Sequence, residues 1–239
     1  MVKARNIIVL ILLILVVDQV IKVWVKTHMP LSYHWDETHM PETKYDNGIR
    51  PFGKTAEWCQ IYFVENEGMA WGWKFGGNLG KMALTLFRMA AVIFGIWYIR
   101  EILRKKYHRG FIICVGLIFA GALGNLLDSM FYGLIFESST YTSVAAIFPD
   151  KGYAGFLHGK VVDMFYFPII RSNYPTWFPF VGGDEFEFFS PVFNLADASI
   201  SVGVITLLIF QKRFMAPLAE AGEKSIETNS KVNDNVQVS

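Results

Sequence analysis

Four long apolar segments divide the chain, and each is long enough to cross a bilayer. A transmembrane helix needs roughly 20 mostly apolar residues. The stretches that meet this length with few charges are 6–25, 81–99, 111–131 and 192–211. The pattern therefore predicts an all-α membrane protein built as a four-helix transmembrane bundle.

The first apolar segment follows Lys3 and Arg5, as the apolar core of a secretory signal would. A signal peptide ends in small residues at a cleavage point. Here the segment continues instead into Asp18, Lys22 and Trp24, and no such point is present. We therefore interpret it as an uncleaved anchor and as the first helix of the bundle.

Basic residues flank the segments on one side. The link between the second and third segments is strongly basic, with Arg100, Arg104, Lys105, Lys106 and Arg109. Lys212 and Arg213 follow the fourth segment. Short cytoplasmic loops are rich in Lys and Arg, so both termini are predicted to face the cytoplasm. Two long extracytoplasmic loops, 26–80 and 132–191, then lie on the other side.

The two loops are too long to be simple turns, and they are rich in aromatic residues. In the first, the run 60–65 predicts a small extramembrane β element, followed by a Gly- and Trp-rich turn at 68–77. Trp and Tyr concentrate at headgroup level, so we expect the loops to lie at the membrane surface. Helices and loops form one membrane domain, 1–216, and the polar stretch 217–239 is predicted to be a disordered cytoplasmic tail.

Composition supports a membrane protein and excludes other classes. The chain is 53% hydrophobic and only 18% charged, which is too apolar for an ordinary soluble domain. Its formal net charge is +1 and it has no basic stripe, so no nucleic-acid partner is expected. The histidines show no metal-ligand spacing, so a zinc protease is not supported. No serine or cysteine lies in a recognisable nucleophile motif, which argues against a rhomboid-like serine mechanism.

Acidic residues inside the helices gather at one level. Counted from the cytoplasmic ends at about 1.5 Å per residue, Asp18, Asp128 and Asp197 lie roughly 18, 26 and 21 Å along their helices. An ionisable side chain that faces lipid costs several kcal/mol, so the three are predicted to share a polar cavity on the outer-leaflet side. Asn125 is three residues before Asp128, and Asn194 is three residues before Asp197, so each pair shares a helix face.

Asp163 differs from these acids because its segment, 161–165, is apolar but too short to span a membrane. It could meet Asp197 from the rim of the bundle. A purely structural role is less expected for Asp163 and Asp197 than for the other acids.

Simpler roles remain open for several of these polar residues. Asp18 and Lys22 are four apart and could form only a structural ion pair. Asn125 and Asp128 could join helices without any role in chemistry. Arg88, inside the second span, is expected to extend outward to the membrane surface.

Five short blocks, taken in order, resemble the lipoprotein signal peptidases. The blocks are Asp18-Gln19 with Lys22, Asn66-x-Gly68-x-Ala70-Trp71, Gly121-Ala122-Leu123-Gly124-Asn125-x-x-Asp128, Val161-Val162-Asp163, and Phe193-Asn194-Leu195-Ala196-Asp197-x-x-Ile200. Each block alone is weak, but the ordered set combined with four spans is specific. The resemblance covers most of the chain outside the second span and the tail.

The resemblance implies an aspartic endopeptidase of the bacterial inner membrane. It implies cleavage of diacylglyceryl-modified prolipoproteins before the lipidated cysteine, near the outer leaflet, by a water that Asp163 and Asp197 activate. Other residues are implied to line or brace the site: Asp18, Lys22, Asn66, Gly68, Asn125, Asp128 and Asn194. The resemblance implies no metal and no other cofactor. The partners implied are the prolipoprotein and membrane lipid, and we expect a monomer.

The chain departs from the family at Ser129, where an arginine usually follows the acid of the third helix. Arg88 is one candidate to supply that cation, since it lies about 10 Å into the second helix from its outer end. The stretches 132–160 and 164–191 are also longer than is usual in the family.

Two other classes of protein remain as alternatives. Intramembrane acids also serve proton relays, so a small proton-coupled transporter or channel subunit is the first. Against it, the acids cluster at one level instead of tracing a path across the bilayer. The second is a non-catalytic scaffold that binds lipoproteins, and it would tolerate loss of Asp163 or Asp197.

Overall fold

The computed structural model describes residues 4–32, 48–53, 58–67, 77–168, 170–188 and 191–214. Within these ranges, four helices are long and apolar enough to cross a membrane. They are Ala4–His28, Leu79–Arg104, Arg109–Ile135 and Leu195–Phe214. The predicted spans are thereby confirmed as helices, whereas the tail 217–239 lies outside the described residues.

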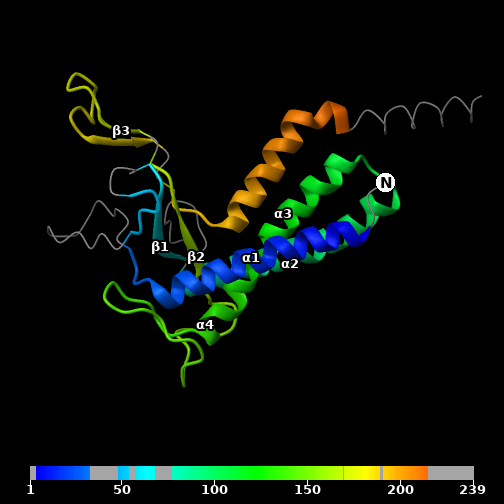
Figure 1. Ribbon diagram of the computed structural model, residues 1–239, viewed down its shortest axis with the longest axis horizontal. Coiled ribbons are helices and arrows are strands. Elements are labelled where there is room, and N and C mark those ends of the chain that lie inside the picture. The colour runs from blue at the N-terminus through cyan, green and yellow to red at the C-terminus, as the bar shows by residue number, and fades with distance from the viewer. Residues whose placement is uncertain are drawn as a thin grey trace, which may run out of the picture.

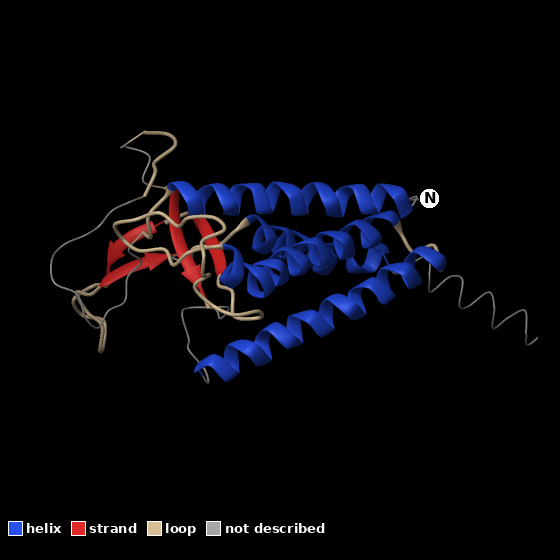
Figure 2. Ribbon diagram, turned by 90° about the horizontal axis from the view of Figure 1, so that it is seen from below, coloured by secondary structure: helices blue, strands red, loops and turns tan. Residues whose placement is uncertain are grey.

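The helices form an elongated bundle that carries the strands at one end (Figures 1 and 2). The first three helices are α1, Ala4–His28; α2, Gly77–Arg104; and α3, Arg109–Leu127. The third span continues from α3 through a π-helix, η2, Asp128–Tyr132, into α4, Gly133–Ile135. The start of α1 and the end of the last helix, Leu195–Phe214, both lie away from the strands. Both helix ends must lie at the same end of the bundle if the termini are on one side of the membrane. That this side is the cytoplasm stays a prediction.

The third span is the central one. Half of the residues in its apolar stretch are buried, against 22% or less in the apolar stretch of each other span. Glycines let the last helix approach it closely, because a Cβ atom at Gly121 would overlap the carbonyl oxygen of Ala196. A Cβ atom at Gly203 would lie 2.8 Å from the carbonyl oxygen of Cys114. Small residues of this kind allow backbone contact between membrane helices, and here they bring the last helix against α3.

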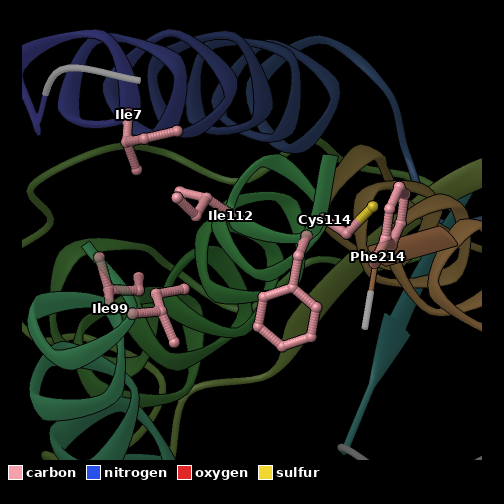
Figure 3. Close-up of a cluster of buried hydrophobic side chains, with 7 residues drawn as sticks. Ile7, Ile99, Ile112, Cys114 and Phe214 are labelled. Carbon is pink, nitrogen blue, oxygen red and sulfur yellow. The ribbon is translucent and has the colours of Figure 1, made fainter. Parts of the chain in front are cut away.

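An apolar cluster closes the bundle at the end away from the strands (Figure 3). Ile7 of α1, Ile99 of α2 and Phe214 of the last helix gather around α3. Their partners on α3 include Ile112 and Cys114. The outward face of α1, by contrast, exposes large apolar side chains, which are Ile8, Val9, Leu12, Leu13, Val16 and Val20. In a bilayer such side chains face lipid, as a membrane span requires.

A two-stranded antiparallel sheet lies at the other end of the bundle. It pairs β1, Gln60–Asn66, with β2, Val161–Tyr166, and Val64 is the partner of Asp163. β2 also bridges Phe193, just before the last helix, through Phe165. The predicted strand at 60–65 is confirmed by β1, and β2 joins that strand directly to the start of the last helix.

The β element is larger than the sequence analysis predicted. A second antiparallel pair, β3, Ile170–Asn173, and β4, Glu185–Phe188, forms a hairpin that projects from the strand end (Figure 1). The apolar, β-branched run at 161–166 carries a strand signal that we had interpreted only as a short apolar segment. Most of the predicted turn at 68–77 lies outside the described residues.

Candidate active site

Asp163 and Asp197 are brought together where β2 meets the last helix. Asp163 is on β2 and is only 3% exposed, whereas Asp197 is half-buried. Asn194 touches both acids: its Nδ2 donates to Asp163 Oδ1 at 2.7 Å, and its backbone N–H donates to Asp197 Oδ2 at 3.4 Å. Among the described residues, Asp163 approaches Asp197 from the rim of the bundle, as predicted. We call these two residues the acid pair.

The position of Asp197 follows from how the last helix begins. Asn194 Oδ1 accepts from the backbone N–H of Asp197 at 2.9 Å, while Asp197 accepts from the backbone N–H of Asn194. This reciprocal arrangement is a capping box. It starts the helix at Leu195, so the predicted start at 192 was three residues early. The carboxylate of Asp197 therefore lies in the first helical turn, where the helix dipole stabilises negative charge.

Asp163 is held by two amides in a desolvated setting. Its Oδ1 accepts from Asn194, and its Oδ2 accepts from Asn66 Nδ2 at 3.0 Å, at the end of β1. Burial raises the pKa of Asp163 to about 7, and the carboxylate of Asp197 adds to the rise. The two amides oppose it because they donate to the charged form. Near neutral pH, Asp163 therefore holds a proton in a substantial fraction of molecules.

Asn125 on α3 connects the acid pair to the buried Lys22 of α1. Its Nδ2 donates to Asp197 Oδ1 at 2.7 Å. Its Oδ1 accepts from Lys22 at 2.9 Å and from Asn194 at 3.2 Å. Both ends of the amide are used, so its orientation is determined by its partners. The side chain thus fixes the distance between Asp197 and the buried cation of α1.

Lys22 lies between two buried carboxylates. Its Nζ is 2.9 Å from Asp18 Oδ2 and 2.8 Å from Asp128 Oδ2, and all three side chains are at most 1% exposed. Asp18 accepts from the backbone N–H of Ala196 at 2.9 Å, and Asp128 accepts from that of Val162 at 3.4 Å. The ion pair considered for Asp18 and Lys22 is therefore present. It also holds the last helix and β2 in place beside the acid pair.

The π-helix positions the loop that leads into β2. Its backbone carbonyls at Ser129 and Met130 accept from the N–H groups of Gly159, at 2.9 Å, and Leu157, at 3.3 Å. A π-helical turn changes which carbonyls remain available to partners outside the helix. The loop before β2 is consequently bound to the third span next to Asp128, and the sequence carried no signal for this turn.

Arg88 does not extend outward, so that prediction was wrong. Its Nη1 donates to Ser129 Oγ at 2.9 Å, and Ser129 Oγ donates to the carbonyl of Asn125 at 2.9 Å. Another contributor that the sequence analysis did not single out is Gln19, which donates to Asp128 Oδ1 at 2.8 Å. Its place beside Asp18 in the first block was the available signal. Gly68 lies outside the described residues, so its role stays a prediction.

A second buried ion pair holds β1 against α1 next to the site. Lys26 pairs with Glu65, the residue before Asn66, and Lys160 approaches the other oxygen of Glu65 at 3.1 Å. Lys26 also lies over the ring of Tyr153, 5.0 Å from its centroid. Burial alone would raise the pKa of Glu65, but pairing with Lys26 and Lys160 outweighs burial and lowers it. The carboxylate is therefore ionised and bound, and it fixes the end of β1.

We expect Lys26→Met to destabilise the protein by about 1–3 kcal/mol, because it removes one of the two cations that pair with the buried Glu65 carboxylate while Lys160 remains. The measurement is thermal unfolding in detergent, with the exposed Lys151→Met as the matched control. Adding Glu65→Gln to Lys26→Met should recover part of the loss. Equal melting temperatures for Lys26→Met and the control would contradict this assignment.

Among the residues that the structure describes, no three His, Cys, Asp or Glu side chains come together as a metal site. The expectation that no metal is needed stays a prediction. What the described residues do provide is a protonatable pair with fixed amide partners. Such a pair can accept a proton at one carboxyl group and donate a proton from the other.

Four membrane-length helices with an acid pair where the bundle meets a small sheet define a membrane protein with a desolvated, protonatable site. Over residues 10–213 the sequence matches the family described as signal peptidase (SPase) II. The chain belongs to the signal peptidase II family and is a transmembrane protease.

Known proteins agree with this assignment. The chain is 46% identical over 219 residues to the lipoprotein signal peptidase of Porphyromonas gingivalis, covering 91% of this chain and 87% of that protein. It is 30% identical over 203 residues to that of Amoebophilus asiaticus, covering 84% and 75%. A solved bacterial membrane enzyme shares the fold, with a TM-score of 0.51 and 21% identity over 88% of this chain and 89% of its own.

Proposed function

We propose that the chain is an aspartic endopeptidase that removes the signal peptide from diacylglyceryl-modified prolipoproteins, cutting on the N-terminal side of the lipidated cysteine. The observation that carries the proposal is the contact of Asn194 with both Asp163 and Asp197 in a desolvated site. Family membership and the names of the relatives supply the substrate class. The enzyme acts in the bacterial inner membrane, as a monomer, with its site near the outer leaflet.

The two acids take different roles because their surroundings differ. Asp197 lies in the first turn of a helix, where negative charge is favoured, so it acts as the base that takes a proton from water. Asp163 is desolvated and holds a proton near neutral pH, so it donates to the scissile carbonyl oxygen. When the tetrahedral intermediate collapses, Asp197 gives the proton it took from water to the leaving amine, and a hydroxyl of the intermediate returns a proton to Asp163. Water attacks directly, and no covalent intermediate with the protein forms.

The remaining site residues orient the pair. Asn66 and Asn194 hold the two oxygens of Asp163, and Asn125 holds Asp197. The ion-paired group of Asp18, Lys22 and Asp128 braces the helices that carry the pair. Because these contacts hold the acid pair in a fixed arrangement, little reorganisation is needed when charge develops in the transition state.

Lipid anchoring would position the substrate. A diacylglyceryl group inserts its chains among the lipids that surround the apolar helix faces. This confines the adjacent peptide bond to the depth of the acid pair. The substrate then reaches the enzyme by diffusion in the membrane plane and not through solution. The extracytoplasmic loops would cover the peptide.

Cleavage of matched substrates tests the proposed function. Purified protein in detergent should cut a diacylglyceryl-modified prolipoprotein at least about 10²-fold faster than the same chain with an unmodified cysteine, because lipid binding supplies orientation. The readout is the initial rate at equal substrate concentration. Equal rates on both substrates, or cleavage of the unmodified chain alone, would remove lipid recognition from the proposal.

The pH dependence of kcat/KM should follow the two roles. Activity requires Asp163 protonated and Asp197 ionised, so it falls as pH rises through the pKa of Asp163 at about 7. It also falls at acid pH, where the pair as a whole takes up a second proton, which gives a bell. A rate that keeps rising from pH 6 to pH 9 would contradict the assignment of Asp163 as the acid.

A further inference from the structure

Arg88 brings a positive charge from α2 to the edge of the acid pair. Its Nη1 donates to Ser129 Oγ at 2.9 Å. Ser129 is only 2% exposed, follows Asp128 directly, and donates in turn to the carbonyl of Asn125. Asn125 is the residue whose amide binds Asp197. The guanidinium is thus anchored to the same turn of the third span that holds the pair.

The contacts of α2 with its neighbours direct Arg88 inward. One turn before Arg88, Thr85 is buried and donates to the carbonyl of Leu157 at 3.1 Å, in the loop before β2. Residues i and i+3 of a helix share a face, so Thr85 and Arg88 point to the same side of α2. That face is the one turned toward the loop and the π-helix.

The buried carboxylates beside the acid pair outnumber the lysine that faces them. Lys22 of α1 contacts both Asp18 and Asp128, so one positive charge faces two structural carboxylates. An ionised member of the acid pair adds further negative charge in a desolvated place. Arg88 lies within electrostatic range of Asp197, Asp128 and Asp163. Its guanidinium stays charged across the working pH range of an enzyme.

We propose that Arg88 is a positioning residue for the acid pair: anchored on Ser129, its charge stabilises the singly ionised pair and determines the pH range in which the pair holds one proton. An opposite charge nearby favours the ionised form of a carboxyl group. Without Arg88, both protons of the pair are lost at higher pH. The inference rests on the proposed function, because it concerns the same reaction.

The test is the pH profile of kcat/KM for cleavage of a diacylglyceryl-modified prolipoprotein by the purified full chain. Arg88→Met and Arg88→Gln should move both limbs of the bell to higher pH by about one unit, equivalent to about a tenfold loss on the acid limb. Arg88→Lys keeps the charge and should keep the wild-type profile. Arg100→Met, at an exposed position of the same helix, is the matched control and should leave the profile unchanged.

If Arg88 had only a structural role, its replacement would lower activity or the melting temperature without shifting the limbs of the pH profile. The proposal is overturned if both neutral variants keep the wild-type profile, or if Arg88→Lys shifts it as far as Arg88→Met. If Arg88→Met does not fold, Arg88→Gln decides, since it retains a donor for Ser129 and lacks the charge. Failure of the proposed function looks different: wild type is then inert, or Asp163→Asn and Asp197→Asn both cleave at the wild-type rate.

Discussion

Asp163→Asn and Asp197→Asn are each expected to lower kcat for prolipoprotein cleavage by at least about 10³. Asparagine fills the same space but can neither take a proton from water nor give one to the substrate carbonyl. Both functions are needed in one cycle, so either substitution alone should remove nearly all activity. Because the residues act as a unit, the double variant should lose little more than each single one.

These variants should remain folded, which separates chemistry from stability. The pKa of Asp163 lies near 7 in the folded protein and near 3.9 in an unfolded chain, so the folded state loses stability as pH rises between these values. Asparagine cannot ionise, so Asp163→Asn should be at least as stable as wild type above pH 7. The exposed Asp150→Asn is the matched control for rate and melting temperature. A retained rate in either acid variant would exclude the two-acid mechanism.

Lys22→Met should have the largest effect on folding. The substitution leaves Asp18 and Asp128 buried side by side without the cation that contacts both. Breaking a buried ion pair by removing one partner costs about 3–5 kcal/mol. Because Asp18 and Asp128 also hold the backbone at Ala196 and Val162, activity should be lost together with stability.

The unfolding temperature and the yield of folded protein measure this effect. Lys151→Met provides an exposed control, and the triple variant Lys22→Met with Asp18→Asn and Asp128→Asn should recover much of the stability. Recovery is expected because neutral amides remove the uncompensated charge. Wild-type stability in Lys22→Met would show that the three residues do not form a required ion-paired group.

Features that the lipid environment requires could be predicted from the sequence. Four spans were recognisable because lipid requires long apolar helices, and the meeting of Asp18, Asp128 and Asp197 followed because lipid excludes exposed charge. The contact of Asp163 with this group was predicted as a possibility, and β2 provides it. The ordered blocks then led to the family that the comparisons identify.

Other features depended on tertiary contacts with weak or no local signal. The capping box of Asn194 and Asp197 was present as an Asn-x-x-Asp spacing, but we had treated it only as a shared helix face. No periodic pattern in the sequence indicates the π-helix after Leu127 or the hydrogen bond from Arg88 to Ser129. Both arise where α2, the third span and the loop before β2 meet. The composition of an isolated segment does not specify which carbonyl or hydroxyl a neighbouring element will bind.

The most direct test of the central claim is the mass of the products formed from a diacylglyceryl-modified prolipoprotein by the purified protein at pH 7. The proposed function predicts one cut, immediately before the lipidated cysteine, made by wild type and Asp150→Asn and absent from the double variant Asp163→Asn, Asp197→Asn. The same product from the double variant, a cut elsewhere, or an inert wild type would contradict it.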